Sequence, residues 1–176
     1  MAATPPEHSI EGASRKMKRT LTRDNALRTV AGVMASAPTL IASLVRPRTS
    51  AALREKVMLG VTSVTNCGLC QWGHSHWARA HGVPLEEVNE ILRQENEALA
   101  AKDPAEAAAI LFAQHYAENL DRIDPASIEN LRQYYSDAQV AEILAYVRAI
   151  TLGSLTGNTL DALLGRFRRE WHSQTS

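Results

Sequence analysis

Two Asp-Pro steps, at Asp103-Pro104 and Asp124-Pro125, constrain the fold most, because each marks the start of a helix. An aspartate at this position can accept hydrogen bonds from the first free N–H groups of a helix. A proline is tolerated in the first helical turn. Elsewhere the chain shows no apolar–polar alternation of strand period bounded by turns. The sequence therefore predicts an all-α chain.

Further helices are predicted from apolar spacing and from local start and stop signals. Pro38 is predicted to break the first helical stretch, because proline has no backbone N–H to donate. Asn66 is predicted to interrupt the chain and cap the next helix, and Gly82 to end that helix. Gly153 and Gly157 are predicted weak points of a long last helix. The predicted helices start near residues 22, 40, 51, 67, 84, 104, 125 and 136.

The length of 176 residues suits one domain with a hydrophobic core. Residues 1–20 are predicted to form a poorly ordered tail, because they are polar, then basic, and lack a sustained apolar period. Residues 21–172 are predicted to form the helical domain. The last helix is apolar on more than one stripe, so part of its surface is predicted to contact another subunit.

The charge balance gives no reason to expect a polyanionic partner. The 19 Lys and Arg residues equal the 19 Asp and Glu residues, so we expect neither nucleic acid nor an anionic membrane to bind. We expect no membrane span, because uninterrupted apolar runs stay well below about 18 residues. The basic residues 15–19 precede no signal-type apolar stretch. With only two cysteines, the chain is no secreted disulfide scaffold, and we expect a cytoplasmic protein.

The two cysteines form a Cys-x-x-Cys motif that predicts thiol chemistry. Cys67 and Cys70 are three residues apart near a predicted helix start, so they share a face and can close a disulfide. The free N–H groups of a helix N-terminus favour the thiolate. His74 lies four residues after Cys70 and can take its proton, and Glu55 on the preceding helix could orient His74. A thiolate beside a second thiol can reduce a hydroperoxide or exchange with a disulfide.

A structural zinc site is the main rival interpretation of this stretch. Cys67, Cys70 and His74 would need a fourth ligand, for which His81 is the candidate. All ligands would then lie in one short helix, whereas structural zinc sites usually use two well-separated pairs. A c-type haem site requires histidine directly after the second cysteine, where this chain has Gln71. No cofactor is predicted.

The other aromatic and histidine side chains near the motif have structural interpretations. His76 is predicted to lie on the surface, and His115 to be a packing residue among alanines. Trp72 and Trp77 are predicted to line the core or a subunit contact, with a substrate pocket as the alternative. An alternative interpretation of Glu55 is a surface charge among basic neighbours, with no role at the thiol site.

A longer pattern surrounds the motif and consists of Glu55, Cys67-x-x-Cys70, His74 and Ala78-Arg79-x-x-Gly82-Val83. This pattern resembles the AhpD-like alkylhydroperoxidase branch of the carboxymuconolactone decarboxylase superfamily. The resemblance is strongest over residues 50–92 and weaker at residues 157–158. It implies an AhpD-like helical bundle that assembles into trimers or hexamers. The best-known members carry a histidine immediately before the second cysteine, where this chain has Leu69.

The resemblance also implies a thiol-dependent reductase that acts on an organic hydroperoxide or hydrogen peroxide. Cys70 would be the peroxidatic cysteine and Cys67 the resolving one, while His74 and Glu55 would relay the proton. A dithiol reductant would regenerate the enzyme. Two alternatives stay open: a redox-responsive or disulfide-exchange binding protein without strong turnover, and a structural zinc helical protein.

Overall fold

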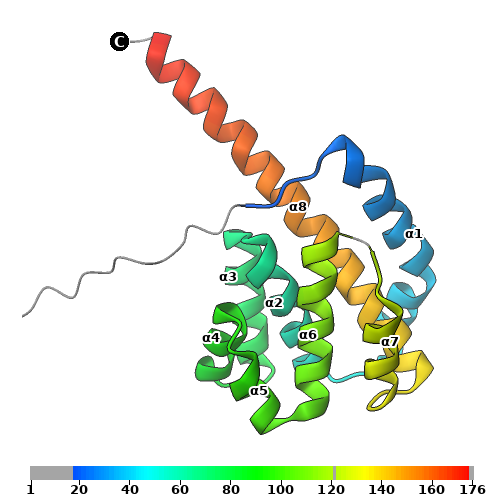
Figure 1. Ribbon diagram of the computed structural model, residues 1–176. Coiled ribbons are helices and arrows are strands. Elements are labelled where there is room, and N and C mark those ends of the chain that lie inside the picture. The colour runs from blue at the N-terminus through cyan, green and yellow to red at the C-terminus, as the bar shows by residue number, and fades with distance from the viewer. Residues whose placement is uncertain (1–17, 121, 175–176) are drawn as a thin grey trace, which may run out of the picture.

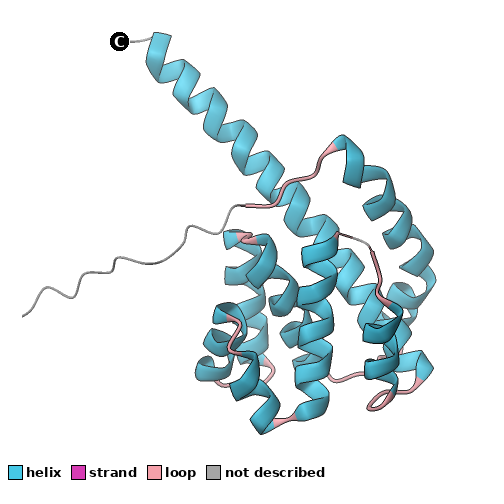
Figure 2. Ribbon diagram, viewed as in Figure 1, coloured by secondary structure: helices cyan, strands magenta, loops and turns pink. Residues whose placement is uncertain are grey.

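The computed structural model describes residues 18–120 and 122–174, with residues 166–174 as backbone only (Figure 1). Residues 1–17, which form most of the predicted tail, lie outside these ranges. All regular secondary structure in the described ranges is helical, as the sequence predicts (Figure 2). The helices are α1 (Arg23–Val45), α2 (Ala51–Thr65), α3 (Gly68–Ala80), α4 (Leu85–Arg93), α5 (Asn96–Lys102), α6 (Pro104–Asn119), α7 (Pro125–Arg132) and α8 (Asp137–Gln174).

α2 is the central helix and packs against α3, α4, α6 and α8. Its apolar side chains join those of α6 and α8 in the main core, with Phe112 and Ile143 among their partners. On another side, Leu59 joins a smaller apolar cluster with Ile91 of α4. Gly60 allows α2 to approach α6 closely, because a Cβ there would lie 3.1 Å from the carbonyl oxygen of Ile110. Packing on several sides therefore fixes the helix that carries Glu55.

The predicted break at Pro38 is wrong, because α1 runs without interruption from Arg23 to Val45 with Pro38 inside it. A proline in a helix interior removes one backbone hydrogen bond. Here α1 packs along α8 on both sides of the proline, with Ser36 buried before it and Ser43 buried after it. These tertiary contacts offset the lost hydrogen bond.

α1 turns polar side chains inward and apolar side chains outward. Its buried residues are Asn25, Thr29, Ser36 and Ser43. Ser36 accepts a hydrogen bond from Arg148 of α8 at 2.8 Å. Six apolar residues, 44% to 82% exposed, form what we call the outer face of α1: Leu27, Val30, Met34, Ile41, Leu44 and Val45. The apolar stripe that predicts this helix therefore faces away from the core.

The junction between α2 and α3 differs from the prediction in one respect. Asn66 ends α2 in the left-handed conformation, with φ of 55°, instead of capping the next helix. Asparagine tolerates this conformation better than most residues that carry a Cβ. Cys67 takes the N-cap position of α3. Gly82, with φ of 86°, lies just beyond the end of α3, as predicted.

Helical structure is more extensive than the sequence predicts. The seven-residue α5 is not predicted, and its N-terminus lacks a side-chain cap that would have marked it. α8 continues through Gly153 and Gly157 without a break, so the predicted weak points are not interruptions. The C-terminal part of α8 projects beyond the bundle (Figure 1).

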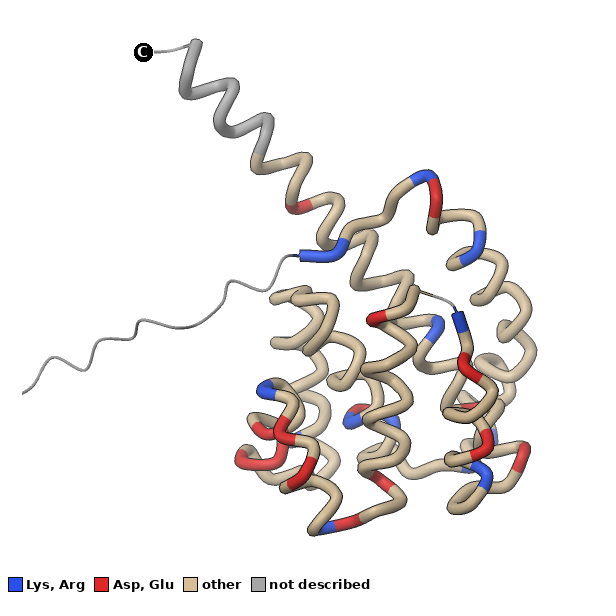
Figure 3. The backbone as a smooth tube through the Cα atoms, viewed as in Figure 1, with Lys and Arg blue, Asp and Glu red and all other residues tan. Residues whose placement is uncertain are grey.

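Two described helices meet the length and hydropathy of a membrane span, although the sequence analysis expects none: α1 and the segment Asp137–Gly165 of α8. The α8 window is 56% buried inside the bundle, as in the core helix of a soluble protein. The α1 window is 17% buried, and no charged residue lies between Arg28 and Arg46 (Figure 3). An exposed apolar helix of this kind is also what a subunit interface requires.

Candidate active site

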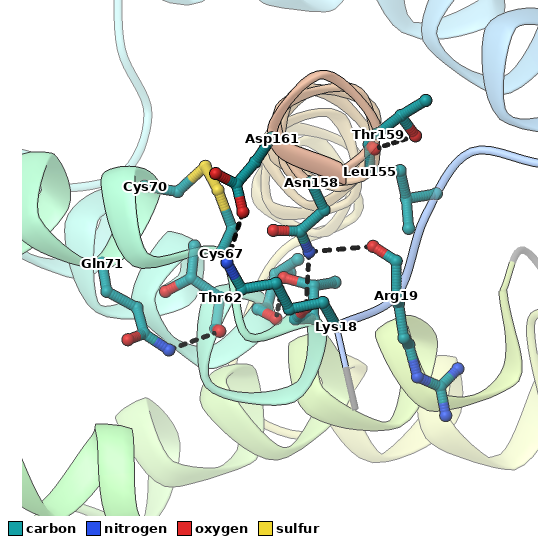
Figure 4. Close-up of a disulfide and its surroundings, with 12 residues drawn as sticks. Lys18, Arg19, Thr62, Cys67, Cys70, Gln71, Leu155, Asn158, Thr159 and Asp161 are labelled. Atoms are coloured by element: carbon teal, nitrogen blue, oxygen red, sulfur yellow. Dashed lines mark hydrogen bonds and ion pairs between the residues drawn. A yellow bond between two sulfur atoms is a disulfide. The ribbon is translucent and has the colours of Figure 1, made fainter. Parts of the chain in front are cut away.

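Cys67 and Cys70 are joined by a disulfide at the start of α3 (Figure 4). Cys67 is the N-cap residue, Cys70 follows three residues later, and their Cα atoms lie 5.3 Å apart. The first N–H groups of a helix have no partners within it and favour nearby negative charge. The fold thus places both sulfurs where a thiolate is stabilised electrostatically.

The two cysteines differ in exposure. Cys67 is 2% exposed, and its sulfur packs against α8, where a Cβ at Gly157 would lie 3.4 Å away. Cys70 is half-buried and is the more accessible residue of the pair. A hollow of about 330 Å³ beside Cys67 is lined in part by Lys18 and Asp161, which form an ion pair at 2.7 Å.

Residues 18–22 form a strap that ties the chain to α2 and α8 beside the disulfide (Figure 4). The backbone N–H of Arg19 donates to the Thr65 carbonyl at 3.2 Å. The Asn158 side chain donates from Nδ2 to the same Thr65 carbonyl at 2.7 Å and to the Arg19 carbonyl at 2.8 Å. These bonds satisfy the carbonyl of Thr65, the last residue of α2, two residues before Cys67.

Glu55 and His74 meet between α2 and α3. His74 Nδ1 lies 2.7 Å from Glu55 Oε2, and Arg54 Nε donates to Glu55 Oε1 at 2.9 Å. Glu55 is 3% exposed, so its alternative interpretation as a plain surface charge is wrong. The contact that the sequence predicts between this acid and this imidazole is present.

The partners of Glu55 keep its carboxyl group ionised. Burial raises the pKa of Glu55, but hydrogen bonds and charges from His74 and Arg54 outweigh burial, so the pKa lies below its ordinary value. An ionised carboxylate only accepts hydrogen bonds, so His74 donates through Nδ1, and Nε2 is the ring nitrogen that does not contact Glu55. Cys70 and His74 are four residues apart on α3, so their side chains are neighbours on one face of the helix.

An apolar hollow of about 480 Å³ opens beside the Glu55–His74 pair and is walled by α1, α2, α3 and α8. Its apolar lining comes from Leu40, Ile41, Leu44, Met58 and Trp77. Its polar lining comes from Ser43, Arg54, Glu55, His74, His81 and Tyr146. Burial raises the pKa of Tyr146, whose protonated hydroxyl donates to Glu142 at 3.1 Å. The hollow can hold an apolar molecule with a polar group near the imidazole.

The four predicted site residues form two pairs in the structure. The hollow that contains Glu55 and His74 has neither cysteine among its described lining residues. The hollow beside Cys67 has neither Glu55 nor His74 among its own described lining residues. The sulfur that the sequence places beside His74 is bonded to Cys67 in this disulfide form. α3 connects the two pairs, because it carries Cys70 and His74 one turn apart.

Several residues around the pair have roles that the sequence does not reveal. In the sequence, only the position of Arg54 next to Glu55 suggests that it belongs to the site. Nothing in the sequence suggests that Tyr146 lines the hollow. Trp77 is 56% exposed and lines the hollow, so the pocket alternative describes it better than the core. Trp72 is 71% exposed, and His115 is also exposed, so neither is a core packing residue. His76 lies on the surface, as predicted.

The zinc interpretation requires Cys67, Cys70, His74 and His81 to bind one metal ion. Among the described residues, no group of three or more His, Cys, Asp or Glu side chains is arranged to hold a metal ion. The two sulfurs are bonded to each other, and His74 Nδ1 contacts Glu55. His81, the proposed fourth ligand, lines the apolar hollow.

A comparison with known protein families shows which family this chain belongs to. A family model, the carboxymuconolactone decarboxylase family, matches residues 28–115, which are 88 of the 176 residues. The chain belongs to the carboxymuconolactone decarboxylase family. The matched range contains all four predicted site residues and the stretch 50–92, whereas residues 157–158 lie outside it. The carboxymuconolactone decarboxylase family includes enzymes, both decarboxylases and alkylhydroperoxidase-like proteins. Comparisons with curated proteins and with solved structures found no significant match.

Acid is expected to destabilise this fold through Glu55 and Glu142. Burial raises the pKa of each carboxyl, but hydrogen bonds, from His74 to Glu55 and from Thr49 to Glu142 among others, outweigh it and lower both values. The folded chain therefore binds protons less readily than the unfolded chain. The resulting stabilisation is present above the ordinary pKa of about 4.3 and is lost as the pH falls through the lower folded value.

We therefore expect the urea midpoint of unfolding to decline below about pH 4. The decline should be shallower in Glu55→Gln than in Glu129→Gln, because Glu129 is a solvent-exposed carboxylate on α7. Equal declines in the two variants would contradict the coupling of Glu55 to folding.

Proposed function

We propose that this protein reduces hydroperoxides, with Cys70 as the attacking thiolate and Cys67 as the resolving thiol. One arrangement carries the proposal: a disulfide at the start of α3 is followed one turn later by a histidine that an ionised glutamate orients. The helix N-terminus favours the thiolate, and His74 accepts the thiol proton. Membership of a family that includes alkylhydroperoxidase-like enzymes supports the same function.

The proposed peroxide reduction has three steps: attack on the peroxide, disulfide formation and regeneration of the thiols. The Cys70 thiolate attacks the terminal oxygen of the hydroperoxide, the O–O bond breaks, and the leaving alkoxide takes a proton from His74 to become an alcohol. The product on the protein is a sulfenic acid. The Cys67 sulfur then attacks this sulfenic acid, water leaves, and the disulfide forms. An external dithiol donates two electrons and two protons through thiol–disulfide exchange and restores both thiols.

Exposure and position support this division of roles. Cys70 is half-buried and is the cysteine one turn from His74, whereas Cys67 is 2% exposed behind α8. An attacking sulfur must meet the substrate, while a resolving sulfur only has to reach its neighbour. The apolar hollow beside His74 suits an organic hydroperoxide with an apolar body.

A redox-responsive binding protein is the second candidate. The strap and α8 both lie against the disulfide, with Gly157 within contact distance of Cys67. Reduction of the disulfide would change the surface against which the strap and α8 pack. This function predicts a change of partner binding or assembly on oxidation, with a single turnover of peroxide and no recycling. The zinc protein is a third candidate, and a metal assay on the purified chain tests it.

Thiol titration tests the enzyme proposal directly. Reduced protein should lose both of its thiols on addition of cumene hydroperoxide and recover them with dithiothreitol. Repeated cycles should consume peroxide in proportion to the dithiol supplied. A reduced chain that keeps both thiols with cumene hydroperoxide and with hydrogen peroxide contradicts the proposed function. About one zinc per chain, with unfolding on chelation, favours the zinc candidate instead.

The outer face of α1 is proposed to be a subunit interface of a homo-oligomer. The face is continuous with the apolar hollow, because Ile41 and Leu44 belong to both. The polar inner side of α1 already has partners within the chain: Ser36 accepts from Arg148 of α8, and the side chains at positions 25, 29 and 43 donate to backbone carbonyls. A second copy that covers the outer face would remove apolar surface from water and close the open side of the hollow.

Leu44→Glu is expected to dissociate this oligomer, because it places a charge in an apolar interface. Leu44 is 82% exposed, so the substitution should leave the monomer fold intact. Light scattering after size exclusion measures the mass, and Tyr134→Glu, on an exposed residue beyond α7, is the matched control. A wild-type chain that is monomeric contradicts the interface, and co-sedimentation of that monomer with neutral lipid vesicles would assign the face to a membrane.

A further inference from the structure

Asn158 of α8 lies between the strap and the end of α2, and it is 2% exposed (Figure 4). Its side-chain amide carries two N–H donors. Nδ2 donates to the Thr65 carbonyl at 2.7 Å and to the Arg19 carbonyl at 2.8 Å. One buried side chain therefore joins two backbone segments that are far apart in the sequence, and one of these segments leads directly into Cys67.

The junction that leads into Cys67 depends on donors from outside α2. Thr65 is the last residue of α2, and Asn66 then turns the chain with φ of 55° into Cys67. The last carbonyls of a helix have no partners within it. The Thr65 carbonyl instead accepts from Asn158 Nδ2 and from the backbone N–H of Arg19. These two bonds hold the point from which the chain turns toward Cys67.

The same turn of α8 also confines the sulfur of Cys67. A Cβ at Gly157 would lie 3.4 Å from Cys67 Sγ, so the sulfur packs on the helix next to Asn158. Cys67 is itself 2% exposed. Two adjacent residues of α8 therefore hold both the sulfur of Cys67 and the backbone that carries it. Cys70 lies three residues farther along α3, away from the junction that Asn158 holds.

We propose that Asn158 is a positioning residue for Cys67 and that it favours closure of the disulfide. Closure requires the two sulfurs to come within about 2.05 Å of each other. A reduced Cys67 that is confined near this position presents a higher effective concentration of thiol to Cys70 than a mobile one.

The inference deepens the proposed peroxide reduction, and its kinetic part rests on that function. Asn158 accelerates the second step, in which the Cys67 sulfur attacks the sulfenic acid of Cys70, the S–O bond breaks and the oxygen leaves as water. It does not accelerate the first step, because the attack on the peroxide uses Cys70 and His74.

Equilibration with glutathione tests the inference without any peroxide. The thiol pair gives two electrons and two protons to one oxidised glutathione, which becomes two reduced molecules as the disulfide closes. Asn158→Ala is expected to lower the equilibrium constant for closure at least about tenfold, which raises the reduction potential by about 30 mV. Asn130→Ala, on an exposed asparagine of α7, should match the wild type. An unchanged constant in folded Asn158→Ala overturns the inference, and so does an equal shift in Asn130→Ala.

Asn158→Ser provides a second test if Asn158→Ala fails to fold, as circular dichroism would show. A serine hydroxyl has one hydrogen, so it can serve at most one of the two carbonyls. The equilibrium constant should shift in the same direction by a smaller factor. An unchanged constant in folded Asn158→Ser then overturns the inference.

Trapping with dimedone, which reacts with sulfenic acids, separates this inference from the proposed function. With cumene hydroperoxide, Asn158→Ala should be attacked at the wild-type rate but should accumulate more dimedone adduct on Cys70, because Cys67 resolves the sulfenic acid more slowly. Equal trapping in the two proteins overturns the inference and leaves the peroxide reduction standing. A wild type that does not react with peroxide contradicts the proposed function, and the glutathione equilibrium still decides the role of Asn158.

Discussion

Cys70→Ser is expected to lower hydroperoxide turnover by at least about a thousandfold, because a serine hydroxyl near neutral pH does not replace a thiolate as nucleophile. Cys67→Ser should still allow one attack, after which the chain stops as a sulfenic acid without a resolving thiol. Peroxide consumption with dithiothreitol measures the turnover. Intact-protein mass measures the single oxygen added to Cys67→Ser.

Two comparisons separate this outcome from a general loss of structure. Ser75→Ala on the same helix should turn over like the wild type, because Ser75 is outside the described lining of both hollows. His74→Ala should slow the attack by roughly a hundredfold or more, the effect of losing a positioned acid–base group. Turnover that survives in Cys70→Ser and disappears in Cys67→Ser would contradict the assigned roles.

Glu142→Gln is expected to lower the free energy of unfolding by about 2–4 kcal/mol, a large share of a typical domain's stability. Glu142 is fully buried, and its carboxylate accepts hydrogen bonds from the Thr49 hydroxyl at 2.6 Å, from the Thr49 N–H at 2.9 Å and from the Arg48 N–H at 3.0 Å. Tyr146 donates to it as well, at 3.1 Å. A glutamine amide would turn donors of its own toward some of these buried donors.

This stability effect has a functional consequence, because Glu142 fixes the loop from which α2 starts. Ser50 caps α2 by accepting from the Leu53 N–H at 3.0 Å, and Glu55 follows in the second turn. Urea unfolding followed by circular dichroism measures the change. Glu129→Gln on α7, where the carboxylate is exposed, is the control and should unfold like the wild type. Equal stability of the two variants would contradict the role of Glu142.

The thiol motif and its neighbours follow from the sequence to a large extent. Cys67, Cys70 and His74 lie within eight residues of one another, so the helical repeat alone relates them. The Glu55–His74 contact is also anticipated, but it depends on how α2 packs on α3. The burial of Glu55 depends on that packing as well, whereas its pairing with Arg54 joins two adjacent residues.

The orientation of α1 shows what the sequence does not reveal. The apolar spacing of Leu27, Val30 and Met34 predicts a helix, and the helix is there. The same spacing would ordinarily assign that stripe to the core, yet Asn25 and Thr29 face inward instead. Both side chains donate to nearby backbone carbonyls, and Ser36 farther along α1 accepts from Arg148 of α8, a contact that exists only once the two helices are side by side.

The sequence by itself determined that the chain is helical, where most of its helices begin, and that a thiol pair and an imidazole share one helix. These features depend on residues that are neighbours along the chain, so backbone geometry fixes them. Only the tertiary structure decided that α1 passes through Pro38, that Glu55 is buried against His74, and that Asn25 and Thr29 of α1 face inward. Those outcomes depend on the shape and polarity of distant segments, which the spacing of residues along the chain does not encode.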